Sequence, residues 1–218
     1  MFADIAEGKA TEGVADTKSK YDFSCAQILK VTGEKVLQAA VWHGNCDPDE
    51  FGSILVAIAT YYNNAYLGWE INGPGFGIGA QIFDRCGYSN VYMRRPDADN
   101  LKSTTALRVG WRTTSKNKVE IVNALQRFLR ERLITIYDIG TISELRVFSR
   151  LGANKWGAAT GHDDRVMALG GALVIMEDVN ALYSDQKKER IKEEEEAKDP
   201  EGPVVDEEPA HPILGTEF

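Results

Sequence analysis

Four acidic residues stand where a folded α/β sheet would expose their side chains. Asp4 follows a short apolar start, and Glu70 closes an apolar run over 65–69. Asp163 and Asp164 follow a Gly-His pair and begin a long apolar stretch. Carboxylates at strand ends and at the start of a helix can meet in such a sheet, where they would bind divalent cations.

A cluster of this kind favours hydrolysis of a phosphodiester bond. Two cations a few ångströms apart would hold the scissile phosphate, one activating the attacking water and the other stabilising the leaving oxygen. Ligand sets made only of oxygen favour Mg²⁺ or Mn²⁺ over zinc. The alternative is structural, because an Asp at a helix start is often a cap and a Glu at a strand end is usually solvated. Spacing alone leaves both interpretations open.

The segments that would position these acids alternate between strand and helix patterns. Two strand-like runs, 24–31 and 35–43, are separated by a short turn and predict an antiparallel hairpin. Asp47 and Pro48 have the pattern of an N-cap and a first helical residue. Further strand patterns occur at 65–71, 89–93 and 133–137, and helical patterns at 119–132, 142–151 and 163–183. This order predicts a mixed α/β sheet with the hairpin at one side and helices on both faces.

Composition excludes several classes of protein. The chain has 218 residues, a formal net charge of −8 and 43% hydrophobic residues, as expected of a globular domain. It has no apolar run long enough for a membrane span and no signal-peptide pattern. Its three cysteines are widely spaced, which argues against a disulfide framework or a CxxC metal site. We expect a domain over 1–184 and, over 185–218, a charged helix end followed by a disordered acidic tail.

Basic residues gather between positions 93 and 132, in the otherwise near-neutral part of the chain. Such a strip is typical of contacts to a phosphate backbone, although a solvated helix face has the same composition. Trp111 lies within the strip and is a candidate for stacking on DNA. The basic candidates for DNA contact are Arg94, Arg95, Arg112, Lys116 and Lys118.

Several segments, in order, resemble the nuclease domain of tailed-bacteriophage large terminases, the DNA-packaging subunits. The helix-opening segment 161–169 (GHDDRVMAL) resembles the corresponding motif of that family. The others are 3–8 (ADIAEG), 22–24 (DFS), 62–72 (YNNAYLGWEIN), 110–114 (GWRTT) with 116–118 (KNK), 137–138 (YD), and 143–145 (SEL) with Phe148. Together they extend over nearly all of residues 1–184.

The resemblance implies a ribonuclease H-like fold and an endonuclease that cuts concatemeric phage DNA during genome packaging. It implies that Asp4 is the first-strand metal ligand, Glu70 the second-strand ligand, and Asp163 or Asp164 the helix ligand. The metal would be Mg²⁺ or Mn²⁺, as two ions. The enzyme would act in the cytoplasm of the infected bacterial host.

The same resemblance suggests auxiliary residues and partners. His162 would orient a water or the scissile phosphate, or serve the structure alone, and Asp22 is a second auxiliary candidate. The partners would be double-stranded DNA, the terminase ATPase domain, the portal and the small terminase subunit, with no membrane. The chain has no GxxxxGK[ST] motif, so we expect no ATP chemistry in it.

Two alternatives remain open. One is a non-catalytic DNA-binding or packaging-scaffold module with the same fold. The other is a different ribonuclease H-like nuclease, such as a resolvase.

Overall fold

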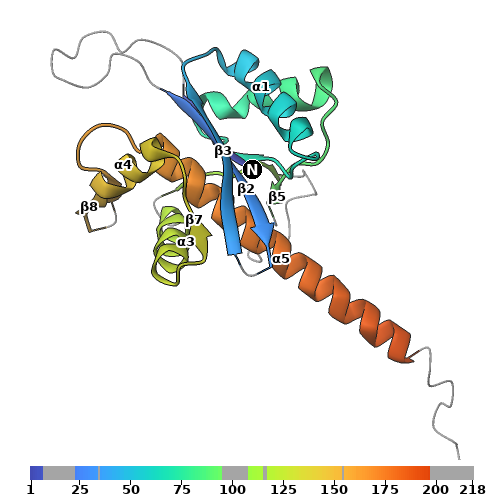
Figure 1. Ribbon diagram of the computed structural model, residues 1–218. Helices are drawn as coiled ribbons and strands as arrows, with labels where there is room; N and C mark the ends of the chain where they lie inside the picture. The colour runs from blue at the N-terminus through green and yellow to red at the C-terminus, as the bar shows by residue number, and fades with distance from the viewer. Residues whose placement is uncertain (7–22, 34, 95–107, 115–116, 154, 197–218) are drawn as a thin grey trace, which may run out of the picture. The chain divides into compact units, whose positions relative to one another are not determined.

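A computed structural model of the chain describes residues 1–6, 23–33, 35–94, 108–114, 117–153 and 155–196 (Figure 1). A five-stranded mixed sheet lies at its centre, in the order β4-β1-β2-β3-β7. The bounds of these strands are β1 Phe2–Asp4, β2 Ser24–Thr32, β3 Lys35–Gly44, β4 Gly68–Trp69 and β7 Ile134–Thr135. The mixed α/β architecture predicted from the sequence is therefore confirmed.

The antiparallel hairpin β2–β3 is the longest pairing of the sheet, and it confirms the strands predicted at 24–31 and 35–43. Gly33 in its turn has φ 59°, a left-handed conformation that a residue with a Cβ rarely adopts. Strand β1 pairs antiparallel with β2 and parallel with β4, while β7 pairs parallel with β3. The strands that carry the first two acids are thus neighbours.

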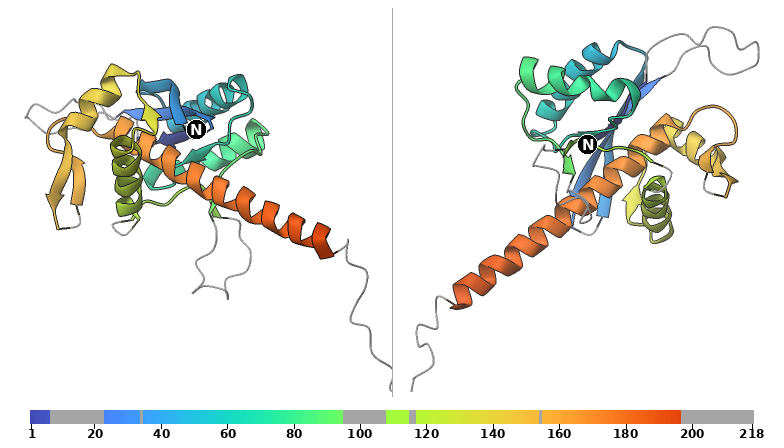
Figure 2. Two further views of the ribbon diagram at one scale, coloured as in Figure 1. Left: turned by 60° about the horizontal axis from the view of Figure 1, so that its bottom comes forward. Right: turned by 180° about the vertical axis from the view of Figure 1, so that it is seen from behind.

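Helices cover both faces of the sheet (Figures 1 and 2). Helix α1, Pro48–Tyr61, begins at the N-cap Asp47 as predicted, because the Asp47 side chain accepts a hydrogen bond from the Asp49 amide. It lies on one face with η1 (Gly73–Phe76), α2 (Ile78–Ala80) and η2 (Gln81–Arg85). The other face carries α3 (Lys118–Arg130), α4 (Ile139–Val147) and the first turns of α5 (Asp164–Glu196).

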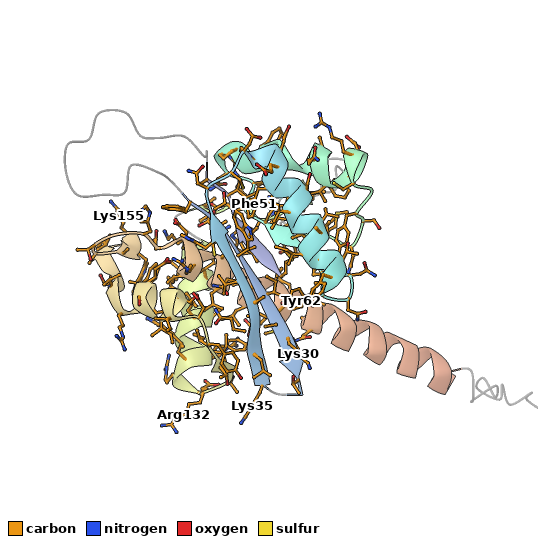
Figure 3. All side chains as sticks on the ribbon, turned by 45° about the horizontal axis from the view of Figure 1, so that its top comes forward. Lys30, Lys35, Phe51, Tyr62, Arg132 and Lys155 are labelled. Atoms are coloured by element: carbon orange, nitrogen blue, oxygen red, sulfur yellow. The ribbon has the colours of Figure 1, made fainter. Side chains whose placement is uncertain are left out.

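Two hydrophobic cores follow from this layering. Successive side chains of a strand point to opposite faces, so Phe2 packs in the core with α3 and α5 while Ala3 packs in the core with α1. Phe51 of α1, labelled in Figure 3, is fully buried and its ring lies 4.6 Å from that of Trp42 on β3. Alternation along β1 places Asp4 on the same face as Phe2, which is the face of α5.

Helix α5 packs very closely against α3 and the sheet at two consecutive glycines. A Cβ on Gly170 would lie 2.4 Å from Ile121 Cγ2, and one on Gly171 would lie 2.4 Å from Phe2 Cε1. Real Cβ atoms do not come so near to other carbon atoms, so only glycine fits at these positions.

The structure differs from the sequence predictions at several elements. The strand predicted at 65–71 is regular only in β4, and its flanks form single bridges, Leu67 to Val91 and Glu70 to Trp111. The helical pattern at 142–151 contains the end of α4 and then a strand, because its last residues pair with a later segment. This hairpin consists of β8 (Phe148–Gly152) and β9 (Lys155–Ala158). A second two-stranded sheet consists of β5 (Met93–Arg94) and β6 (Arg108–Val109).

The chain divides into two compact units, Met1–Asp178 and Val179–Phe218. The first contains the sheet, both cores and all four predicted metal ligands. The second contains the last turns of α5, which extends beyond the helix predicted to end at 183. The predicted domain boundary after residue 184 stays a prediction. No helix in the described ranges is long and apolar enough to cross a lipid bilayer.

Candidate functional site

The sheet brings Asp4 and Glu70 to the same edge. Asp4 is the last residue of β1, and Glu70 directly follows β4, the parallel neighbour of β1. The Glu70 amide donates a hydrogen bond to the Ala3 carbonyl at 2.9 Å, which places the two acids at the same level of adjacent strands. The carboxyl ends of parallel strands lie at the same edge of a sheet, so the topology explains why the two carboxylates are close together.

Helix α5 contributes the other two acids. Asp163 directly precedes the helix and Asp164 is its first residue. Both are partly buried. Their negative charges act on Asp4, so the start of α5 lies within electrostatic range of the end of β1. The four predicted ligands therefore lie in the same region of the fold, and their role as one metal site stays a prediction.

Asp4 has the clearest electrostatic signature in this site. Burial raises its pKa well above the ordinary value of 3.8, and the charge of Glu70 and a hydrogen bond with it raise the pKa further. Asp164 and Asp163 add smaller effects in the same direction. Neighbouring carboxylates disfavour one another's ionised forms unless a proton or a cation lies between them.

Asp163 and Asp164 have different surroundings. Asp163 Oδ2 lies 3.9 Å from Lys118 Nζ. Asp164 Oδ2 lies 3.7 Å from both His43 Nε2 and His162 Nδ1, and no donor in the described ranges forms a hydrogen bond with it. Asp164 thus has a buried oxygen without a hydrogen-bond partner in the described residues, whereas Asp163 lies beside the ammonium group of Lys118.

His43 is a member of this site that the sequence did not indicate. It pairs with Cys25 across the hairpin, and Cys25 pairs with Asp4, so the three residues form one row across three strands. The His43 ring stacks on Phe23 with 4.9 Å between centroids, and the His162 ring meets the edge of Phe23 at 5.7 Å. Only the strand register would have predicted this row.

Cys25 lies in the middle of the row and is fully buried. Burial raises the pKa of its thiol strongly, and the charge of Asp4 adds to this effect. The thiol therefore stays neutral and is not a nucleophile or a thiolate ligand at neutral pH.

The donor set fits a hard divalent cation in its chemistry. It consists of carboxylate oxygens whose negative charges repel one another. One of these oxygens, Asp164 Oδ2, has no hydrogen-bond partner in the described part of the chain. Within the same ranges, no three His, Cys, Asp or Glu side chains converge closely enough to hold a single ion.

The predicted DNA-binding residues have varied positions. Arg112 is exposed, and Lys118 is partly buried beside Asp163. Arg94 is partly buried in β5, and its Nε atom has no hydrogen-bond partner in the described ranges. Trp111 is only 4% exposed and packs in the core with α3 and α5, so its placement favours a packing role over the predicted stacking on DNA. Asp22, Arg95 and Lys116 lie outside the described residues.

Comparison with solved structures identifies this architecture. The crystal structure of the large terminase nuclease from thermophilic phage G20c matches with a TM-score of 0.52 and 21% sequence identity, over 77% of this chain and 76% of that one. Structures of the same nuclease with bound magnesium and with bound cobalt match with TM-scores of 0.52 and 0.53, each over 70% of this chain and 74% of that one, at 22% and 21% identity. No protein-family model and no curated protein sequence matches the chain. The chain thus shares the fold of this large terminase nuclease, as the resemblance in the sequence implied.

Proposed function

We propose that this chain is a metal-dependent DNA endonuclease. The observation that carries the proposal is the placement of Asp4 beside Glu70 at the ends of adjacent parallel strands, near the start of α5. Burial and the neighbouring carboxylates raise the pKa of Asp4 there, in agreement with this placement. A buried carboxyl group next to other acids lowers the stability of the fold when it ionises. A bound cation would remove this cost, which makes the group a suitable metal ligand.

Asp4, Glu70 and Asp164 would hold the cations, with Asp163 as the further helix ligand. Bound Mg²⁺ or Mn²⁺, as two ions, would polarise the scissile phosphate and supply the Lewis-acid chemistry of phosphodiester hydrolysis. A cation beside Asp4 would favour its ionised form, because the positive charge would oppose the burial and the neighbouring negative charges that raise its pKa.

The remaining residues of the site position the substrate. His43 and His162 flank Asp164 and carry ring N–H groups suited to a phosphate oxygen. Arg112 and Lys118 would contact the DNA backbone without reading its bases, as would Arg94. Contacts of this kind give a nuclease with little sequence preference.

The similar structures support this proposal. The G20c protein is a large terminase nuclease, and its structures hold magnesium in one case and cobalt in another. We infer that this chain acts in the same process, the cutting of concatemeric phage DNA during genome packaging. The partners would be duplex DNA, the terminase ATPase domain, the portal and the small terminase subunit, in the cytoplasm of the infected host.

Incubation of the chain with supercoiled plasmid tests the proposal. We expect nicked and linear products with Mn²⁺ or Mg²⁺ and none with a chelator. Asp4→Asn should abolish the products, whereas Asp84→Asn, at an exposed acid of η2, should not. DNA binding that is unaffected by Asp4→Asn, without cleavage by the parent protein in any cation, would instead favour the scaffold alternative. Preferential cutting of four-way junctions would favour a resolvase.

A further inference from the structure

A buried polar network lies behind the carboxylates, between the sheet and helices α4 and α5. Its members are less than a tenth exposed, and they come from β2, β3 and α4: Gln27, Gln38, Thr141 and Glu144. Buried polar groups of this kind are costly unless each finds a partner, and fully paired they fix the elements that carry them.

The Thr141 hydroxyl is the centre of this network. It accepts hydrogen bonds from Gln27 Nε2 at 3.0 Å and from Gln38 Nε2 at 3.2 Å, and it donates one to Asp138 Oδ2 at 2.7 Å. Gln38 Oε1 accepts from the amides of Tyr137 and Asp138. The start of α4 is therefore anchored to two neighbouring strands of the sheet.

Arg165, the residue after Asp164, joins α5 to this network through both its backbone and its side chain. Its amide donates to Glu144 Oε2 at 2.8 Å, and its Nη1 donates to Glu144 Oε1 at 2.6 Å. Its carbonyl accepts from Gln27 Nε2 at 3.2 Å, and its Nε lies 3.5 Å from Asp138 Oδ2. The amide, the carbonyl and Nη1 of Arg165 are thus hydrogen-bonded to other elements, whereas its buried Nε lies near Asp138 without a hydrogen bond in the described residues.

The bond from Glu144 to the Arg165 amide replaces an ordinary helix cap. The first amides of a helix have no partner within the helix, and an Asp at its start usually accepts from them. Asp164 Oδ2 has no hydrogen-bond partner in the described residues, and the Arg165 amide donates to Glu144 instead. Because α4 supplies this carboxylate, the Oδ2 atom of Asp164 remains available as a ligand.

We propose that Glu144 and Arg165 are positioning residues, which cap and orient the start of α5 so that Asp163 and Asp164 face Asp4 and Glu70. This inference rests on the proposed metal-dependent function. It assigns to two buried residues, neither of them a predicted ligand, control over the affinity of the site for its cation. Partners that orient metal ligands in this way typically change metal affinity 10- to 100-fold.

Gly140 provides an independent way to disturb the same arrangement. A Cβ at Gly140 would lie 2.7 Å from Arg165 Nε and 3.1 Å from Asp138 Oδ2. Gly140→Ala therefore displaces the guanidinium group without removing any charge. Glu144→Gln keeps the shape of the side chain but removes the charge that Arg165 pairs with.

The test measures Mn²⁺ binding by calorimetry without DNA, together with the melting temperature of the metal-free protein. The matched control is Arg127→Gln, which breaks the ion pair between Arg127 of α3 and Glu177 further along α5. We expect Glu144→Gln and Gly140→Ala each to weaken Mn²⁺ binding at least tenfold. Arg127→Gln should leave it within twofold of the parent protein.

The outcomes separate this inference from the proposed function. If the parent protein binds Mn²⁺ and both variants bind it equally well, the positioning role is wrong while the metal site stands. If all three variants weaken binding in proportion to their loss of melting temperature, the network is only structural and the inference is overturned. If the parent protein binds no Mn²⁺, the proposed function fails, and the positioning role fails with it.

Discussion

Asp4 is the last residue of β1 and Glu70 directly follows β4, the parallel neighbour of β1, so the two acids lie side by side at one edge of the sheet. Burial raises the pKa of Asp4, and the charge of Glu70 raises it further. Ionisation of Asp4 beside Glu70 therefore has a cost in the metal-free protein. A cation bound between the two carboxylates would remove this cost.

We predict that Asp4→Asn stabilises the metal-free protein. The pKa of Asp4 is raised on folding, so its contribution to stability is complete below its ordinary pKa of 3.8 and is lost as pH rises through the folded value. The melting temperature of the variant should exceed that of the parent protein by about 2–4 °C at pH 7, the shift that about 1 kcal/mol produces in a domain of this size. At pH 4 the difference should be smaller.

The same variant should have no nuclease activity, because the first ligand is lost. A variant that is both less stable at pH 7 and still active would contradict the site. Asp84→Asn, in which an exposed acid is neutralised, serves as the control for both measurements.

Divalent cations should stabilise the parent protein. A cation present at about 100 times its Kd adds about 2.7 kcal/mol, which raises the melting temperature by roughly 5–10 °C. We expect Mn²⁺, Mg²⁺ and Ca²⁺ all to produce a shift, and cleavage to be strongest with Mn²⁺, weaker with Mg²⁺ and absent with Ca²⁺. Mn²⁺ tolerates irregular oxygen geometry better than Mg²⁺, while Ca²⁺ coordinates too loosely to place the attacking water. Equal shifts in Asp4→Asn would mean that the cations bind elsewhere.

Thr141→Val should destabilise the protein by about 1–3 kcal/mol, because it leaves the amide groups of Gln27 and Gln38 with fewer buried partners. Burial alone would raise the pKa of Asp138, but hydrogen bonds from Thr141 and the charge of Arg165 outweigh it and lower the pKa below 3.8. This part of the stability is present above pH 3.8 and is lost as pH falls through the lowered value.

Urea unfolding of Thr141→Val at pH 7 and at pH 3 checks this prediction. The difference from the parent protein should shrink at the lower pH. Thr60→Val, on the exposed side of α1, is the matched control and should change the free energy of unfolding by less than about 0.5 kcal/mol.

Replacement of Arg112, Lys116 and Lys118 by Gln should weaken duplex binding and flatten its salt dependence. Each lost phosphate contact reduces the slope of log K against log salt by about 0.9. Lys30, Lys35 and Arg132 are the matched control, because they lie at the turn end of the β2–β3 hairpin (Figure 3). Equal effects of the two triple variants would mean that only net charge matters.

Local patterns predicted much of this molecule. The hairpin, the Asp47 cap of α1 and the position of Asp4 and Glu70 at strand ends all depend on neighbours in the sequence. So does the start of α5 at Asp164. Each of these features is decided within a few residues, where alternation, turn chemistry and capping act.

Features that depend on distant neighbours were not predictable in this way. His43 joins the site only because of the register of the hairpin with β1, and Glu144 reaches Arg165 across two elements. Trp111 lies in a basic segment, which suggested contact with DNA, but its side chain is buried in the core. A backbone bridge to Glu70 holds its segment against the sheet. Strand β8 follows α4 directly, with no change in the hydrophobic pattern, so the sequence predicted one helix over 142–151.

The two glycines of α5 give the site an unusual dependence on residues that have no side chain. Gly170 and Gly171 let the backbone of α5 lie directly against the side chains of Ile121 on α3 and Phe2 on β1, so these contacts fix the distance of α5 from α3 and from the sheet. A single methyl group there would act as a wedge. The start of α5 would shift away from α3 and the sheet, and Asp164, about two turns before the glycines, would shift with it. Substitutions at these positions would thus change cation binding from a distance, through geometry alone.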